Sequence, residues 1–295
     1  MNIAGAVYES LTTFEINRDN YTEVLSTYEY SFTLPFERFN GTYETCEFLQ
    51  QYWQHTVTVS VVYFALIKSI QWAMRDRPAF DLQWPLILWN IGLAIFSMVG
   101  LIRFGEDFSE SFINRGVYTT LCTMPAATGP APYWSYLFLI SKLVEMGDTL
   151  FIVLRKRPLI FLHYYHHVVV LIYTAHSGAE RATPGRAFMA MNYAAHSLMY
   201  SYYAARAMGK RPPEMVSVAI TTCQTIQMIV GVAISVWTLY IKTQLGWKCQ
   251  QSIANLYLGF FIYFTFAFLF IQFFVNRYIK SKKIAAEKKE AKKLQ

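Results

Sequence analysis

Histidine side chains crowd one apolar stretch, residues 159–174, where the sequence reads LIFLHYYHHVVVLIYT. On a helix that turns about 100° per residue, His163, His166 and His167 share one side, within about a third of the circumference. Neutral imidazole acts as a nucleophile and as a proton carrier near pH 7. Polar groups buried in a bilayer are costly, so such a cluster faces a cavity or a partner and marks a functional site by default. The pattern predicts nucleophilic or acid–base chemistry on this helix.

Three further apolar stretches carry polar residues, most of them at helical spacing. They are Lys142, Glu145, Asp148 and Thr149 in the first stretch, Asn192, His196, Met199, Tyr203 and Arg206 in the second, and Thr221, Gln224 and Gln227 in the third. An internal ion pair between Lys142 and Glu145 that only holds the bundle together is one interpretation of the first set. Four polar surfaces directed inward predict a shared cavity, which could conduct a solute, hold a metal ion or host catalysis.

The elements that must position these residues are membrane-spanning helices. The chain is 54% hydrophobic and only 15% charged, whereas a soluble domain carries about a quarter charged residues. Spans of about 20 apolar residues are expected at 56–74, 85–102, 133–154, 159–174, 186–208, 215–240 and 253–278, with a loop at 103–132. The sequence predicts an all-α polytopic membrane protein: an acidic segment at 1–55, a seven-helix domain at 56–280 and a basic tail at 281–295.

Charge asymmetry predicts the orientation of these spans. Residues 1–54 hold eight acidic and two basic side chains, and residues 276–295 hold eight basic and two acidic ones. Basic clusters also follow the first, third and fifth spans, as at Arg75, Arg155–Arg157 and Lys210. Because cytoplasmic loops are enriched in Lys and Arg, the C-terminus is expected in the cytosol and the N-terminus on the opposite side. This asymmetry indicates orientation and not nucleic-acid binding.

Cysteines and sequons fit the same orientation. Cys122 and Cys249 fall in loops on the non-cytosolic side, where a disulfide can form, and we expect them to pair, with Cys46 on the same side as a competitor. The four cysteines show no metal-binding spacing. Asn20 and Asn40 begin Asn-x-Thr tripeptides and are candidate glycosylation sites.

Four motifs follow one another along the chain. They read Lys142-x-x-Glu145-x-x-Asp148-Thr149, His163-x-x-His166-His167, Asn192-x-x-x-His196-x-x-Met199-Tyr200-x-Tyr202-Tyr203 and Thr221-x-x-Gln224-x-x-Gln227. In this order they resemble the KxxExxDT, HxxHH, NxxxHxxMYxYY and TxxQxxQ boxes of the very-long-chain fatty acid elongases, the ELO family of 3-oxoacyl-CoA synthases. The resemblance covers about residues 56–280, and the sequence RPLIFLHYYHH is most similar to the branch that extends palmitate-type chains. Residues 1–50 carry no such motif, and no role is predicted for them.

The resemblance implies a seven-helix fold in which spans two to seven form a six-helix ring around an acyl tunnel that is open to the cytosol. It also implies a reaction: a fatty acyl-CoA condenses with malonyl-CoA to give 3-oxoacyl-CoA, CO2 and CoA, with no cofactor and no metal. His166 is expected to take the acyl group, with His163, His167 and His196 orienting it and moving protons. Asn192 and Gln224 would donate hydrogen bonds to the oxygen on which negative charge develops.

Further residues are expected to bind the substrates. Lys142 and Arg206, with Arg155–Arg157, would meet the CoA phosphates at the cytosolic mouth. The predicted substrate-binding set is Lys142, Glu145, Asp148, Tyr203, Arg206, Gln224 and Gln227.

The expected location is the endoplasmic reticulum membrane. Lys292 and Lys293 resemble a cytosolic dilysine retrieval signal, which a receptor reads. The expected partners are the bilayer, the two thioester substrates and the other enzymes of the elongation cycle, namely the 3-oxoacyl-CoA reductase, dehydratase and enoyl reductase. A second copy of the chain, in a homodimer, is a further candidate partner.

Two other functions use similar features. A di-iron membrane desaturase or hydroxylase also carries HxxHH boxes, but it needs more histidines than the six in this chain. A transporter with a midplane site would show internal repeats and helices broken by Gly or Pro, and the histidine stretch at 159–174 contains neither residue.

Overall fold

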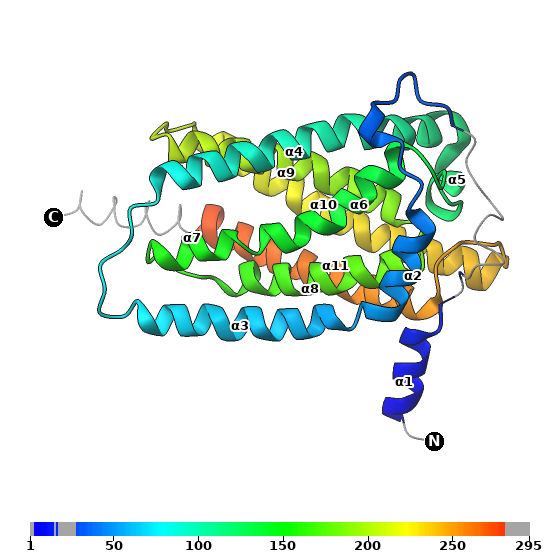
Figure 1. The fold of residues 1–295 in the computed structure, drawn as a ribbon, viewed down its shortest axis with the longest axis horizontal. Helices are drawn as coiled ribbons and strands as arrows, with labels where there is room; N and C mark the ends of the chain where they lie inside the picture. Colours follow the sequence, from blue (N-terminus) through cyan, green and yellow to red (C-terminus); the bar gives the residue numbers. More distant parts are fainter. Residues whose placement is uncertain (1–2, 15, 17–27, 281–295) are drawn as a thin grey trace, which may run out of the picture.

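The structure, a computed structural model, describes residues 3–14, 16 and 28–280, and these contain helices and no strand. Figure 1 shows the helices, most of them aligned with the long axis of the molecule. They are α1 (Ile3–Thr12), α2 (Thr42–Tyr52), α3 (His55–Ala73), α4 (Gln83–Glu110), α5 (Gly116–Cys122), α6 (Pro130–Glu145), α7 (Asp148–Leu154), α8 (Phe161–Ala179), α9 (Gly185–Ala207), α10 (Glu214–Tyr240) and α11 (Ile253–Phe274). The prediction of an all-α fold is therefore confirmed.

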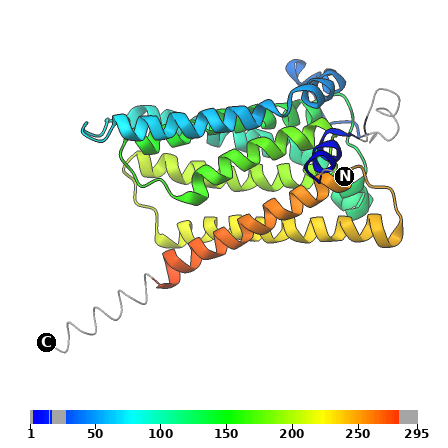
Figure 2. The ribbon, with the colours of Figure 1, turned by 90° about the horizontal axis from the view of Figure 1, so that it is seen from below.

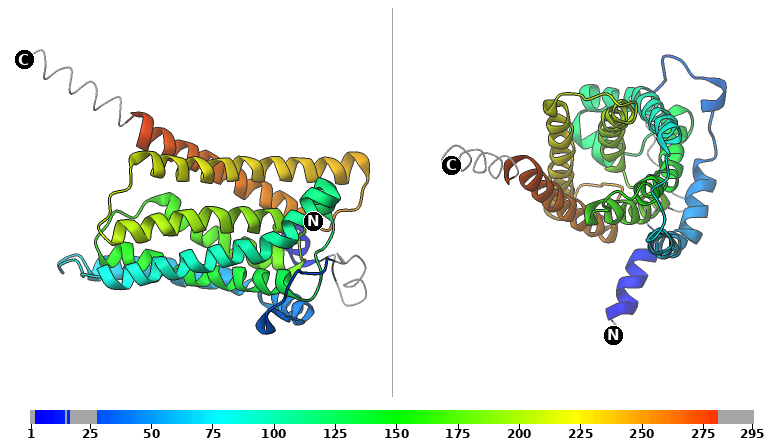
Figure 3. Two further views of the ribbon diagram at one scale, coloured as in Figure 1. Left: turned by 90° about the horizontal axis from the view of Figure 1, so that it is seen from above. Right: turned by 90° about the vertical axis from the view of Figure 1, so that its left-hand side faces the viewer.

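Six long helices close into a ring within the described part of the chain. Helix α4 packs on α6, α6 on α8, α8 on α11, α11 on α10, α10 on α9, and α9 returns to α4. The end-on view in Figure 3 shows this ring, and Figure 2 shows how its helices run side by side. Helix α3 stays outside the ring, against α7 and α8. The ring that the resemblance implies is therefore present.

Several helices have the length and apolarity needed to cross a membrane. Four such segments lie among the described residues: His55–Ala73, Gln83–Cys122, Glu214–Leu245 and Ile253–Lys280. Large apolar side chains on them are exposed, such as Leu88 at 67%, Ile102 at 70% and Phe268 at 63%. A surface of this kind suits lipid. The chain is thus a polytopic membrane protein, and seven crossings remain a prediction because α6, α8 and α9 carry the polar motifs.

Two predicted boundaries are wrong. The expected loop at 103–132 is helical as far as Cys122, because α4 continues to Glu110 and is followed by a π-helical turn (Ser111–Arg115) and α5. Helix α4 continues past its apolar part because Arg103 and Asp107 are buried against charged partners, Glu37 and Arg186. The expected single helix at 133–154 is interrupted between α6 and α7, where Gly147 lies so close to Trp89 that a Cβ atom would come within 2.8 Å of the indole.

A disulfide joins Cys122 and Cys249, the pair predicted from the sequence. It links the end of α5 to the loop before α11. Cys46, the possible competitor, is a buried free thiol that donates to the carbonyl oxygen of Gly178 at 3.3 Å. Asn40 is exposed just before α2, so its glycosylation stays a prediction.

Three other predicted sites lie outside the described residues. They are Asn20, Lys292 and Lys293.

Candidate functional site

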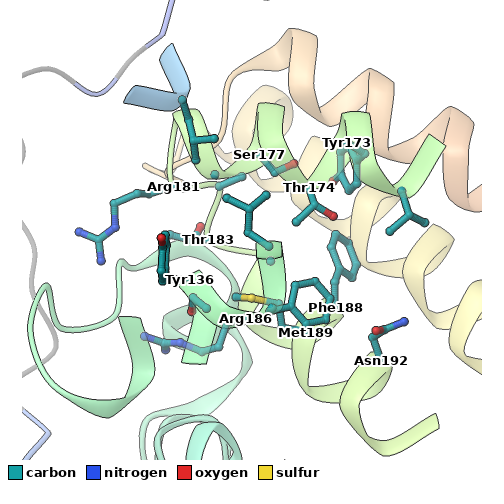
Figure 4. Close-up of a pocket in the computed structure, with 18 of the residues that line it drawn as sticks. Tyr136, Tyr173, Thr174, Ser177, Arg181, Thr183, Arg186, Phe188, Met189 and Asn192 are labelled. Atoms are coloured by element: carbon teal, nitrogen blue, oxygen red, sulfur yellow. The ribbon is translucent and has the colours of Figure 1, made fainter. Parts of the chain in front are cut away.

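One pocket lies inside the ring and is lined mainly by apolar side chains of α6, α8, α9, α10 and α11. His166, Asn192 and Gln227 line it, and so do Cys46 and Leu49 of α2. Figure 4 shows Asn192 on one side of the pocket and Arg181 and Thr183 on the other. A mostly apolar pocket with a few polar groups suits an apolar ligand that has one polar end.

The three histidines of α8 lie together, as their spacing predicts. The ring centroids of His163 and His167 are 4.6 Å apart, and those of His166 and His167 are 5.4 Å apart. His163 Nε2 lies 3.0 Å from Thr149 Oγ1, which in turn lies 2.5 Å from the hydroxyl of Tyr63. His163 is therefore engaged by α7 and α3 and is held in one orientation.

His166 differs from its neighbours in two ways. It lines the pocket, whereas His163, His167 and His196 do not. Within the described chain no side chain or backbone group hydrogen-bonds its imidazole, which touches the rings of His167 and Phe266. An imidazole nitrogen with no hydrogen-bond partner beside an apolar pocket can approach the reactive end of a bound ligand.

A buried polar network lies beside this pocket. Lys142 Nζ donates to Glu145 Oε1 and to Asn192 Oδ1, both at 2.8 Å. Because its oxygen accepts from Lys142, the amide of Asn192 turns its Nδ2 towards His196 Nε2, 3.2 Å away. An imidazole that accepts at Nε2 carries its proton on Nδ1, and Nδ1 of His196 faces Glu145 Oε1 at 3.6 Å. The network fixes both the amide orientation of Asn192 and the tautomer of His196.

Lys142 has partners within the protein, and its predicted contact with CoA phosphates stays a prediction. Its side chain is only 3% exposed and is neutralised by Glu145, which is equally buried. The internal ion pair with Glu145 that the sequence suggested is present. A buried ammonium group requires such a partner, because removing its charge from water is otherwise very costly.

Asp148 also has a different position from the one predicted. Its carboxylate accepts one hydrogen bond from Trp89 Nε1 at 2.5 Å and another from the hydroxyl of Tyr200 at 2.7 Å. It thus connects α7 to α4 and α9, and both oxygens are already engaged. These contacts hold the three helices together, and a role of Asp148 in binding substrate stays a prediction.

The remaining predicted residues divide between the pocket and its surroundings. Gln227 lines the pocket, while Gln224 Nε2 contacts the sulfur of Met199 at 3.2 Å. Tyr203 is 47% exposed and Arg206 is exposed, both beyond His196 towards the C-terminal end of α9. These two side chains are outside the pocket that His166 lines.

The basic residues 155–157 lie in the loop between α7 and α8, at the opposite end of the bundle from the disulfide. Sequence reasoning missed the α2 residues of the pocket, because they belong to a segment without a motif. The described residues contain no group of three His, Cys, Asp or Glu side chains that could hold a metal ion. The geometry thus offers no support for the di-iron alternative.

The fold and the site define a class: a polytopic membrane protein whose ring of helices encloses an apolar pocket beside a buried histidine cluster. The sequence model of the ELO family, described as the GNS1/SUR4 family, matches residues 48–286. The chain belongs to this family.

Named relatives agree with the family assignment. The chain is 52% identical over 286 residues to "Putative fatty acid elongase 4" of Caenorhabditis elegans, with 96% of this chain and 98% of the relative covered. It is 38% identical over 244 residues to human "Very long chain fatty acid elongase 3", covering 82% of this chain and 90% of the relative. It is also 38% identical over 272 residues to "Very long chain fatty acid elongase 6" of Drosophila melanogaster, covering 90% of this chain and 86% of the relative.

Proposed function

We propose that this protein is a very-long-chain 3-oxoacyl-CoA synthase that joins a fatty acyl-CoA to malonyl-CoA. The observation that carries the proposal is the position of His166, whose imidazole lines an apolar pocket and has no hydrogen-bond partner among the described residues. The family and the names of the relatives support the same reaction. The pocket provides the apolar surroundings that a fatty acyl chain requires.

The reaction proceeds in two steps. A ring nitrogen of His166 attacks the thioester carbon of the acyl-CoA, the C–S bond breaks, and the CoA thiolate leaves with a proton as free CoA. Malonyl-CoA then loses CO2, and the resulting enolate carbon attacks the acyl-imidazole. The C–N bond breaks and 3-oxoacyl-CoA is released. The imidazolate of His166 that leaves takes up one proton from solvent, which replaces the proton lost with CoA, so His166 is neutral again. An acyl-imidazole needs a site that excludes water, and the pocket is lined mainly by apolar side chains.

The polar network supplies the remaining functions. Negative charge develops on the carbonyl oxygen of the acyl group during both steps, and hydrogen-bond donors positioned beforehand stabilise it. Asn192 and Gln227 are the amide side chains that line the pocket with His166. His196, with its proton held on Nδ1 towards Glu145, is oriented by the network. His167 packs against His166 and fixes the plane of its ring.

The two ends of the bundle receive different roles. The disulfide Cys122–Cys249 supports a non-cytosolic, oxidising environment at its end. CoA would then approach the opposite end, where Arg155–Arg157 and Arg206 supply cations for its phosphates. We propose the endoplasmic reticulum membrane as its location, with the N-terminus in the lumen.

The product defines the expected partners. A 3-oxoacyl-CoA must next be reduced, dehydrated and reduced again, so a 3-oxoacyl-CoA reductase, a dehydratase and an enoyl reductase are the expected neighbours. The proposed reaction uses no group besides the two thioesters. A homodimer is proposed as the assembly state, to be tested by size-exclusion chromatography with light scattering.

The test is condensation by the purified protein given labelled malonyl-CoA and palmitoyl-CoA. The wild type should form labelled 3-oxoacyl-CoA, and His166→Ala should lower the rate by about a thousandfold or more, since it removes the acyl acceptor. His55→Ala is the matched control, because His55 is exposed and lies outside the pocket. Full activity of His166→Ala would show that His166 is not the acyl acceptor.

A further inference from the structure

Arg186 places a buried cation at the wall of the apolar pocket. It lies in the first turn of α9 and lines the same pocket as His166. Its side chain is only 1% exposed. Figure 4 shows Arg186 and Thr183 on the side of the pocket away from Asn192. A cation is disfavoured at the N-terminal end of a helix, where the helix dipole is positive, so the stability of α9 gives no reason for an arginine at this position.

The guanidinium group of Arg186 is only partly engaged. Its Nη1 donates to Ser111 Oγ at 2.7 Å, and its Nε lies 3.3 Å from Asp107 Oδ2. Its Nη2 has no hydrogen-bond partner among the described residues. The same holds for both carboxylate oxygens of Asp107, whose side chain is also 1% exposed. A buried donor and a buried acceptor thus lie next to each other without hydrogen bonds, which costs free energy that a suitable ligand group would recover.

The charges at this position favour a neutral ligand group. Arg186 and Asp107 balance each other, so a further carboxylate would be buried without a cation of its own. Arg181 also lines the pocket, but it donates to the backbone carbonyls of Pro125 and Ala126 at 3.0 and 3.4 Å. A hydroxyl group matches the pair, because its oxygen accepts a hydrogen bond from the guanidinium while its hydrogen is donated to the carboxylate.

We propose that Arg186 and Asp107 form a second polar site of the pocket, which binds a hydroxyl group at the ω end of an acyl chain. The proposal rests on the function proposed above and specifies a substrate class for it, the ω-hydroxyacyl-CoA thioesters. The thioester lies at His166, the methylene groups fill the apolar part of the pocket, and the hydroxyl group contacts Arg186. Arg186 is therefore a specificity-determining residue that selects for a terminal oxygen.

The first test compares matched acyl-CoAs with and without an ω-hydroxyl group, in a series of chain lengths. The ratio of their kcat/KM values is taken at the length that each series prefers. The wild type should use the hydroxylated chain at least as well as the plain one, whereas an apolar wall would penalise the hydroxyl group by up to about a hundredfold. The double variant Arg186→Met with Asp107→Leu leaves no buried ion without a partner, and it should lower the ratio by about tenfold to a hundredfold.

A second ion pair provides the matched control. Arg115→Met with Glu110→Leu removes a partly exposed pair in the turn after α4, and neither residue lines the pocket. This control should keep the wild-type ratio. A wild-type ratio in the variant of Arg186 and Asp107, or an equal loss in the control, would overturn the proposal.

The second test changes the charge of the site and keeps its donor. Asp107→Asn leaves the Arg186 cation without its buried partner, so a terminal carboxylate should become the better match. The kcat/KM of an ω-carboxyacyl-CoA relative to the ω-hydroxyacyl-CoA should then rise by about tenfold or more. A carboxylate that is rejected as strongly as by the wild type would contradict a site built on this pair.

Binding separates this proposal from the proposed reaction. The rise in Tm caused by each acyl-CoA is measured for the wild type and the variants without malonyl-CoA. If no protein forms product but the gain in binding from the hydroxyl group disappears with Arg186→Met and Asp107→Leu, the site is supported and the proposed reaction fails. If the wild type condenses and neither the ratio nor binding depends on Arg186, the site alone is overturned.

Discussion

Replacing Glu37 with glutamine tests how the segment before α2 is anchored to α4 and α6. Its carboxylate is fully buried and accepts from Arg103 Nε at 2.8 Å, from Arg103 Nη2 at 2.6 Å and from Trp134 Nε1 at 2.8 Å. Burial alone would raise the pKa of Glu37, but the hydrogen bonds from Arg103 and Trp134 lower it to about 2. Glu37 is therefore ionised at neutral pH and forms a buried ion pair.

The loss of stability expected for Glu37→Gln depends on the partners that Arg103 keeps in the variant. Removing one partner of a buried pair costs about 3–5 kcal/mol. Arg103 would keep Glu106 at 3.3 Å and the carbonyl of Phe32 at 2.7 Å, so we expect the lower end, about 3 kcal/mol. At about 2–4 °C per kcal/mol, the Tm should fall by about 6–12 °C.

The assay is thermal melting of the purified protein in detergent, at pH 7. Glu44→Gln is the control, because Glu44 is exposed on α2 and undergoes the same chemical change. The double variant Glu37→Leu with Arg103→Met should recover much of the loss, since an apolar pair leaves no buried charge. A Tm within 1–2 °C of wild type for Glu37→Gln would refute the reasoning.

Three other perturbations have defined outcomes. Lys142→Met leaves the buried carboxylate of Glu145 without its cation, so stability should fall by about 3–5 kcal/mol; denaturation that matches wild type would contradict this. Cys122→Ser removes the bond to Cys249 and should cost about 2–4 kcal/mol, seen as a lower Tm that reductant no longer changes. The pKa of Glu37 is about 2 in the folded protein against an ordinary 4.5, so its stabilisation is present above about pH 4.5 and is lost as pH falls towards 2. Between pH 4.5 and pH 2, the Tm of Glu37→Gln should therefore fall less than the Tm of the wild type.

Local spacing accounts for the parts of the site that were predicted from the sequence. His163, His166 and His167 share a face because the period of an α-helix is independent of tertiary context, and their rings indeed lie together. Charge and loop position likewise predicted the disulfide between Cys122 and Cys249, which is present. The polytopic helical class followed from long apolar runs.

Contacts between distant segments account for what was missed. Lys142 could equally have faced an anionic substrate or Glu145, and only packing against α9 brings Asn192 Oδ1 within 2.8 Å of its Nζ. The extension of α4 past residue 102 depends on Arg103 finding Glu37, 66 residues away. A hydropathy pattern contains no such information, because the cost of a buried charge is known only once its partner is placed.

The most direct test is to trap the acyl group on the protein. The wild type is incubated with palmitoyl-CoA in the absence of malonyl-CoA, quenched and analysed by intact mass and by peptide mapping. The account predicts release of one CoA per active site and a palmitoyl adduct on His166, which disappears when malonyl-CoA is added and is missing in His166→Ala. CoA release with the adduct on another residue, or condensation with no acyl-protein at any time, would contradict it.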